Sequence, residues 1–262
     1  MYSFPLISQQ LVPADLARLQ TELELAHRVQ LSLLPKAPPS IPGLDLWGIS
    51  HPASHVGGDF YDFIVRPNRT LTFFIGDVSG KGLPAAMLMT MTRIILRAEA
   101  DSPIAPNPET ILQNANAKLL ADFLEAGTFV TVFVGQYCPS SRELVYANAG
   151  HSPVIFRPTG GRARLLEADG TALGVLQETF SRNHRVYLEK GDLLIAATDG
   201  LNEARNPRHE QFGLSRLLNQ MYQLDSQPAA EISRSILGTV WEFSSGEPQA
   251  DDQTVVVLRC TG

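Results

Sequence analysis

The chain has 262 residues, of which 44% are hydrophobic and 18% are charged, a balance typical of a globular protein with a large core. No apolar run approaches the ~20 residues that a membrane-spanning helix needs, and the first ten residues do not form a signal peptide, so we expect a cytoplasmic protein with no membrane segment. The net charge of −6 argues against nucleic-acid binding. Two cysteines are too few for a disulfide framework or a four-cysteine zinc site.

Residues 1–43 are predicted to form an N-terminal segment with one helix over about 14–34. Its apolar positions recur at alternating spacings of four and three, the pattern of a short coiled coil. The stripe comprises Val12, Leu16, Leu19, Leu23, Ala26, Gln30 and Leu33. We expect a parallel homodimer in which the polar Gln30 fixes the register; the alternative is a helix that packs on its own domain. Prolines at positions 35, 38, 39 and 42 then predict a stiff connector.

From residue 44 to residue 262 the pattern predicts one compact domain rich in strands. Short apolar runs separated by Gly, Pro, Asn and Asp cover residues 44–50, 59–65, 70–78, 128–137, 143–149, 153–156, 182–188, 192–198 and 253–260. Helical periodicity covers residues 83–100, 109–124, 214–224 and 229–243. Several strands are apolar on both faces and must be covered on both sides. Two stacked sheets flanked by helices satisfy this requirement.

Acidic residues stand at the ends of several of these buried strands. They are Asp59 in VGGDFYD, Asp77 in GDVSGKG, Asp199 in TDG, and the adjacent Asp251 and Asp252 in ADDQT. A single Asp at a strand end is usually a turn former. Carboxylates gathered at one sheet edge would repel each other unless a cation neutralised them, so the sequence predicts a metal site.

The residue types narrow the choice of metal and reaction. Only carboxylates occupy these positions, which favours Mg²⁺ or Mn²⁺ over zinc. Paired divalent ions are commonly used to hydrolyse phosphate esters. The segment GDVSGKG is not a phosphate-binding P-loop, because only three residues separate its first two glycines and Gly82 stands where Ser or Thr would be needed.

Five motifs together carry a family resemblance. VGGDFYD, GDVSGKG, NAGH, TDGLNEA and DDQT occur in the order found in the PPM family of metal-dependent protein phosphatases (type 2C-like). The chain most resembles the bacterial SpoIIE/RsbU-like branch over residues 44–262, and ELELAHRVQLSLLP resembles that branch's regulatory linker. The resemblance implies an α+β fold of two stacked antiparallel β-sheets flanked by helices. It also implies hydrolysis of phosphoserine or phosphothreonine in a protein by metal-activated water.

The resemblance also implies a role for each acidic residue. Asp77 would bridge two divalent cations, Mn²⁺ or Mg²⁺, and the Val78 carbonyl would bind the first. Asp59 would serve the first cation directly or through water. Asp199 and Asp251 would hold the second, with Asp252 as the alternative to Asp251.

Two departures from the eukaryotic branch concern substrate binding and proton donation. The arginine that binds the substrate phosphate in that branch has no evident counterpart before Asp59, and Lys81 stands in the turn that carries a histidine there. Lys81 is therefore either a phosphate contact or proton donor, or a surface residue without a role. His151 in NAGH lies near the site by resemblance, and a structural role is the usual one for such a histidine.

The resemblance suggests partners that no residue of this chain identifies. The implied substrate is a phosphorylated anti-sigma-factor antagonist, a small domain of a bacterial partner-switching pathway. An upstream sensory domain or a separate regulator would supply the signal. Two other functions are weighed against this one: a metal-dependent hydrolase of a small phosphoester, and a non-catalytic regulatory module of the same fold.

Overall fold

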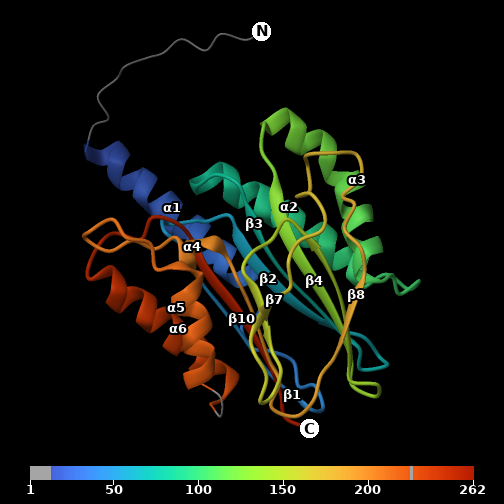
Figure 1. Cartoon of the computed structure of the whole chain (residues 1–262). Coiled ribbons are helices and arrows are strands. Elements are labelled where there is room, and N and C mark those ends of the chain that lie inside the picture. The colour runs from blue at the N-terminus through green and yellow to red at the C-terminus, as the bar shows by residue number, and fades with distance from the viewer. Residues whose placement is uncertain (1–12, 225–226) are drawn as a thin grey trace.

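Two five-stranded sheets stack face to face in the computed structural model, which describes residues 13–224 and 227–262 (Figure 1). Neighbouring strands in both sheets pair antiparallel. The first sheet has the order β1-β10-β9-β6-β7: Leu44–His51, Gln253–Cys260, Leu193–Ala197, Val154–Arg157 and Arg164–Leu165. The second has the order β2-β3-β4-β5-β8: Asp59–Val65, Leu71–Val78, Val130–Cys138, Glu143–Ala149 and His184–Tyr187.

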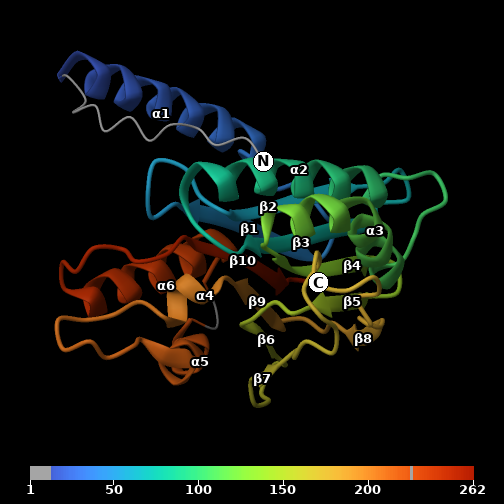
Figure 2. The same cartoon turned by 90° about the horizontal axis from the view of Figure 1, so that it is seen from above.

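Helices cover the outer face of each sheet, which confirms the predicted α+β sandwich (Figure 2). α2 (Gly82–Ala100) and α3 (Pro108–Ala126) lie on the second sheet, while α5 (Gly213–Gln223) and α6 (Ala229–Ser244) lie on the first. No helix in the described part of the chain is long and apolar enough for a membrane crossing.

Local chemistry explains why the helices begin and end where they do, as α3 illustrates. The side-chain oxygen of Asn107 accepts the N–H of Thr110 at 2.9 Å and caps the first turn, and Pro108 occupies the first helical position. Gly127, with φ 63°, adopts the left-handed conformation that ends the helix. Capping residues of this kind allow the ends of the helix to be predicted from the sequence.

Helix α1 (Pro13–Leu33) divides its apolar stripe between two environments. The C-terminal half packs on the domain, where Ala26, Gln30 and Leu33 line a groove shared with α2. The N-terminal half projects past the domain, and Leu16 and Leu19 are 45% and 47% exposed (Figure 2). Val12 lies outside the described residues. The alternative of a helix packed on its own domain therefore holds for the C-terminal half.

The role predicted for Gln30 is wrong. Its side chain is buried against the chain's own residue Gly57 and is not available to a partner helix. The heptad spacing could not reveal this, because the same apolar stripe serves either a second helix or the helix's own domain.

Candidate metal centre

The strand register brings the first two predicted ligands together. Asp59, the first residue of β2, pairs directly with Asp77 near the end of β3, and Asp77 in turn pairs with Thr131 of β4. Residues directly opposite on neighbouring antiparallel strands have Cβ atoms about 4.5–5.5 Å apart. The two carboxyls therefore meet at one edge of the second sheet.

The first sheet delivers the remaining acidic residues to the same edge. Asp199 opens the short helix α4 (Asp199–Asn202) directly after β9. Asp251 and Asp252 precede β10, the strand that pairs with β9. Carboxylates from both sheets thus converge at one end of the sandwich, as the sequence predicts.

Two adjoining cavities of about 150 and 160 Å³ open at this end of the sandwich. Asp77, Thr131 and Asp199 line both of them. The first cavity is completed by Val78, Ser79, Gly80, Phe129 and Asp251, and the second by Gly150, His151, Ser152 and Asn202. Four of the six predicted site residues therefore reach the cavity wall: Asp77, Val78, Asp199 and Asp251.

Asp59 lies behind that wall and is buried. Its Oδ2 accepts the Thr198 hydroxyl at 2.7 Å, and its backbone pairs directly with that of Asp77 across β2 and β3. Asp59 is thereby held directly behind Asp77. Thr198 was not singled out in the sequence, although it directly precedes Asp199 in the TDG motif.

Asp252 also lies behind the wall, and its oxygens are already engaged. Oδ1 accepts the N–H of Ala53 at 2.7 Å, and Oδ2 accepts the N–H of Gly58 at 2.6 Å and of Asp59 at 3.4 Å. Asp251, in contrast, faces the cavity and forms an ion pair with Lys81 at 2.9 Å. This arrangement favours Asp251 over Asp252 as a ligand.

Three glycines in two of the motifs are required by close packing around Asp252 and Val78. A Cβ on Gly57 would lie 2.0 Å from Asp252 Oδ2, and one on Gly58 would lie 2.6 Å from the Val78 carbonyl oxygen. A Cβ on Gly200 would lie 2.0 Å from the Asp252 carbonyl oxygen. VGGD, GDV, TDG and DD therefore form one packed unit around the cavity.

The acidic residues are held in an electrostatically unfavourable arrangement. Burial, followed by repulsion from Asp199, Asp251 and Asp252, raises the pKa of Asp77 to about 7. Burial, followed by repulsion from Asp77 and Asp252, also raises the pKa of Asp59. Burial and the nearby carboxylates of Glu203 and Asp251 raise the pKa of Asp199. A bound cation would relieve this repulsion.

The donor set fits hydrated divalent cations. Asp77, Asp199 and Asp251, together with Val78, line a cavity well above the about 10–15 Å³ that one water needs. Among residues 13–224 and 227–262, no group of three or more His, Cys, Asp or Glu side chains is arranged so that it could hold a metal ion. Mg²⁺ typically keeps several waters and binds through one or two carboxylates, so it does not need three side chains at once.

The two basic candidates near the cavity have different surroundings. The Lys81 ammonium lies at the rim, where it contacts Asp251 and donates to the Ala250 carbonyl. His151 is buried, its Nδ1 lies 2.9 Å from the Thr131 hydroxyl, and burial lowers its pKa to about 4. The His151 side chain is therefore neutral at pH 7 and cannot donate a proton as an imidazolium.

Asp62, the other acid of the DFYD strand, faces away from the centre. Its Oδ2 contacts Arg93 at 2.6 Å and Arg97 at 2.8 Å, both on α2. The alternation of side chains along β2 therefore separates Asp62 from Asp59, as expected for residues three apart.

Comparisons with known proteins agree with this arrangement. The model of the family described as Stage II sporulation protein E (SpoIIE) matches residues 67–261. The phosphoserine phosphatase RsbU of Bacillus subtilis is 31% identical over 244 residues, which cover 92% of this chain and 70% of RsbU.

Solved structures share the fold. The PP2C domain of SiaA from Pseudomonas aeruginosa superposes with a TM-score of 0.83 at 23% identity, covering 95% of this chain and 99% of that domain. RsbX, solved in complex with magnesium, gives a TM-score of 0.62 at 16% identity, covering 86% of this chain and 99% of RsbX.

The fold is that of the PP2C-type domains. The chain belongs to the SpoIIE family, because the family model covers more than half of it and RsbU matches along most of its length. The resemblance found in the five motifs is thereby confirmed.

Proposed function

We propose that this chain hydrolyses phosphoserine or phosphothreonine in a protein, using two divalent cations, Mn²⁺ or Mg²⁺. One observation carries the proposal: Asp77, Asp199 and Asp251, from three separate segments, line a single polar cavity together with Val78. The relationship to RsbU, a phosphoserine phosphatase, supports the substrate class.

Different residues would bind the two cations and orient the residues that bind them. Asp77 would be shared by the two cations, the Val78 carbonyl would bind the first, and Asp199 and Asp251 would hold the second. When bound, such a pair lowers the pKa of a water and neutralises charge on the phosphoryl group. Asp59, held by the Thr198 hydroxyl directly behind Asp77, would serve the first cation directly or through water. Lys81 brings an ammonium to the rim, where it can contact a phosphoryl oxygen of the incoming side chain.

Phosphate release tests the reaction. We expect turnover of a phosphoserine peptide in Mn²⁺ or Mg²⁺ and complete loss in EDTA, and Asp77→Asn should abolish it. The control Asp62→Asn, which alters a carboxylate on the opposite face of β2, should retain most of the activity of the folded enzyme. Activity that survives chelation would overturn the metal-dependent mechanism. A peptide turned over no better than an aryl phosphate would favour a small-molecule substrate.

We further propose that the substrate is a phosphorylated anti-sigma-factor antagonist in a partner-switching pathway. The support is the relationship to RsbU along most of this chain. Screening the enzyme against phosphorylated antagonist domains from its own genome tests the proposal. Equal rates on these domains and on unrelated phosphoproteins would contradict it.

The projecting half of α1 is proposed to pair with the same helix of a second copy and to receive the activating signal from an upstream domain or separate regulator. Exposed Leu16 and Leu19 support this pairing. Replacing both by Asp should abolish self-association without unfolding the domain, because they lie beyond the packed half of the helix. A double variant that remains dimeric by light scattering would refute the pairing.

A further inference from the structure

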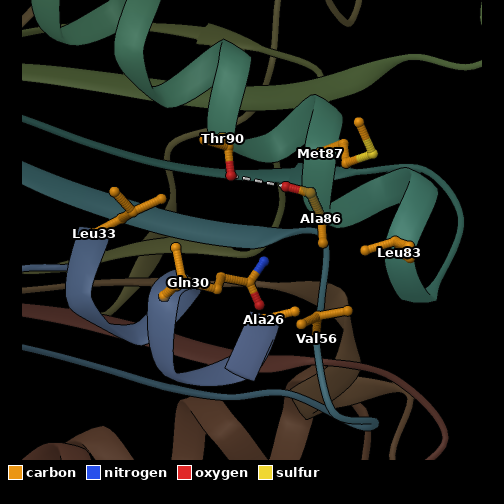
Figure 3. A pocket seen from close by; sticks show the side chains of 9 residues that line it. Ala26, Gln30, Leu33, Val56, Leu83, Ala86, Met87 and Thr90 are labelled. Carbon is orange, nitrogen blue, oxygen red and sulfur yellow. Dashed lines mark hydrogen bonds between the residues drawn. The ribbon is translucent and has the colours of Figure 1, made fainter. Parts of the chain in front are cut away.

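Gln30 is the one buried polar side chain on helix α1 among its described residues, at 7% exposure. Its Nε2 donates to the Gly57 carbonyl at 2.7 Å, and its Oε1 accepts the Gly57 N–H at 3.0 Å. One amide side chain thus satisfies both polar groups of a single residue. Figure 3 shows Gln30 extending from α1 toward the segment that carries Val56.

Gly57 belongs to a loop that is bonded to the second sheet at Gly58, whose carbonyl accepts the N–H of Val78 on β3 at 3.3 Å. Residues 52–58 join β1 to β2 and lie outside both strand ladders. On one side, Asp252 accepts the N–H groups of Ala53 and Gly58. On the other side, α1 contacts the loop through Gln30 and through His27, whose ring hydrogen-bonds to the His55 carbonyl. The helix and the closing acidic motif therefore hold the loop between them.

The Gln30–Gly57 pair lies two residues from Asp59 and next to the contact with Asp252. Gly57 is covalently joined to Gly58, so movement of the Gly57 peptide would displace the Gly58 N–H from Asp252 Oδ2, 2.6 Å away, and would shift Asp59 next to it. Asp59 in turn pairs directly with Asp77 across β2 and β3. α1 is therefore connected to the cavity through the Gln30–Gly57 hydrogen bonds and the first residues of β2.

The packing of α1 on α2 leaves Gln30 as the main polar anchor at this place. An apolar groove of about 390 Å³ separates the two helices, and Val29, Leu83 and Met87 in its walls are exposed. Thr90, also in the groove, bonds only within its own helix, to the Ala86 carbonyl at 2.9 Å (Figure 3). The groove makes apolar contact between the helices incomplete, so the docked position of α1 depends on its polar contacts with the loop, the Gln30 pair and the bond of His27 to the His55 carbonyl.

We infer that Gln30 is a positioning residue for the metal centre: by fixing Gly57, it sets the placement of Asp59 and thereby the affinity of the site for divalent cations. The inference rests on the proposed metal-dependent function. Loss of a residue that supports metal ligands typically lowers metal affinity 10–100-fold. The effect on catalysis at saturating metal should be much smaller, because Gln30 itself does not line the two acidic cavities.

The test compares Gln30→Leu with Thr90→Val in the full chain. Each variant replaces a polar side chain with an apolar one of similar size in the same groove, and Thr90 does not contact Gly57. Mn²⁺ affinity is measured by calorimetry without substrate, and phosphate release is measured across a Mn²⁺ titration. We expect Gln30→Leu to bind Mn²⁺ at least tenfold more weakly, with kcat at saturating Mn²⁺ within about threefold of the parent. Thr90→Val should change neither value more than twofold.

Hydrogen exchange provides a readout that does not require metal. In EDTA, a peptide covering residues 53–59 should take up deuterium faster in Gln30→Leu than in the parent and in Thr90→Val. Parental Mn²⁺ affinity in Gln30→Leu would overturn the inference while leaving the proposed function intact. So would a loss of kcat that saturating Mn²⁺ does not restore. A parent protein that neither binds Mn²⁺ nor releases phosphate would instead refute the proposed function, and the inference with it.

Discussion

Asp251 and Asp252 are adjacent in sequence, yet their contacts predict opposite effects of substitution. Asp252 accepts the N–H of Ala53 at 2.7 Å and that of Gly58 at 2.6 Å. A hydrogen bond to a charged group contributes about 1.5–3 kcal/mol, so losing two costs about 3–6 kcal/mol. Removing one of several mutually repelling carboxylates offsets roughly 1–2 kcal/mol of this. We therefore expect Asp252→Ala to lower the free energy of unfolding by about 2–4 kcal/mol.

Asp251→Asn should leave stability nearly unchanged and damage metal binding. Its ion pair with Lys81 joins side chains that are 36% and 59% exposed, and surface pairs of this kind contribute about 0–1 kcal/mol. Loss of a charged ligand from the cavity should weaken Mn²⁺ binding at least tenfold. The loss of Mn²⁺ affinity should be larger than in Asp252→Ala, where the cavity wall keeps its three carboxylates.

Urea unfolding in EDTA measures the first quantity, and calorimetric titration with Mn²⁺ measures the second. The assignment fails if Asp251→Asn destabilises the metal-free protein by more than about 2 kcal/mol, well above the range for a surface pair. It also fails if Asp252→Ala unfolds at the same urea concentration as the parent. Either result would contradict the assignment of Asp251 as a metal ligand and of Asp252 as a structural hydrogen-bond acceptor.

Three further predictions follow from buried charges and from the cavity. Asp62→Asn should lower the free energy of unfolding by about 3–5 kcal/mol in urea titration, because it leaves Arg93 buried without its carboxylate partner, while activity per folded molecule stays near that of the parent. Burial lowers the pKa of His151 to about 4, below its unfolded value of about 6.5, so its neutral form contributes stability above pH 6.5 that is lost as the pH falls toward 4. Between pH 7 and pH 5 the parent should lose about 2 kcal/mol more than His151→Asn, and parallel pH profiles would contradict this. Asp199→Asn should raise the Mn²⁺ concentration needed for half-maximal phosphate release at least tenfold, and an unchanged requirement would remove Asp199 from the ligand set.

Much of the fold was predictable because buried strands and capped helices leave periodic patterns. Each predicted strand and helix of the domain lies within two residues of its observed bounds. The strand β7 and the helix α4 were missed, because two and four residues are too short to show a period. Sheet order was not predictable either, since local patterns do not specify which strands pair across the chain.

The candidate site was predictable in composition and less so in geometry. Glycine-flanked acids at strand ends identified the carboxylates, but the roles of Asp59 and Asp252 depend on partners distant in sequence, such as Thr198 and Ala53. Gln30 was assigned to a helix pair because amphipathic spacing shows which face is buried and not what covers it. Its contact with Gly57 depends on tertiary packing alone.

The glycines around Asp252 limit how this centre can change or be transplanted. A methyl group on Gly57 or Gly200 would overlap an oxygen of Asp252, and one on Gly58 would crowd the Val78 carbonyl. These motifs are therefore sterically interlocked, and a substitution in one requires compensation in another. Grafting the cavity onto a different scaffold would require moving all of these loops together, because the carboxylates alone would not bring their backbones into such close contact. Substitution of any one of these glycines should be among the least tolerated changes in the domain, although none of them bears a reactive group.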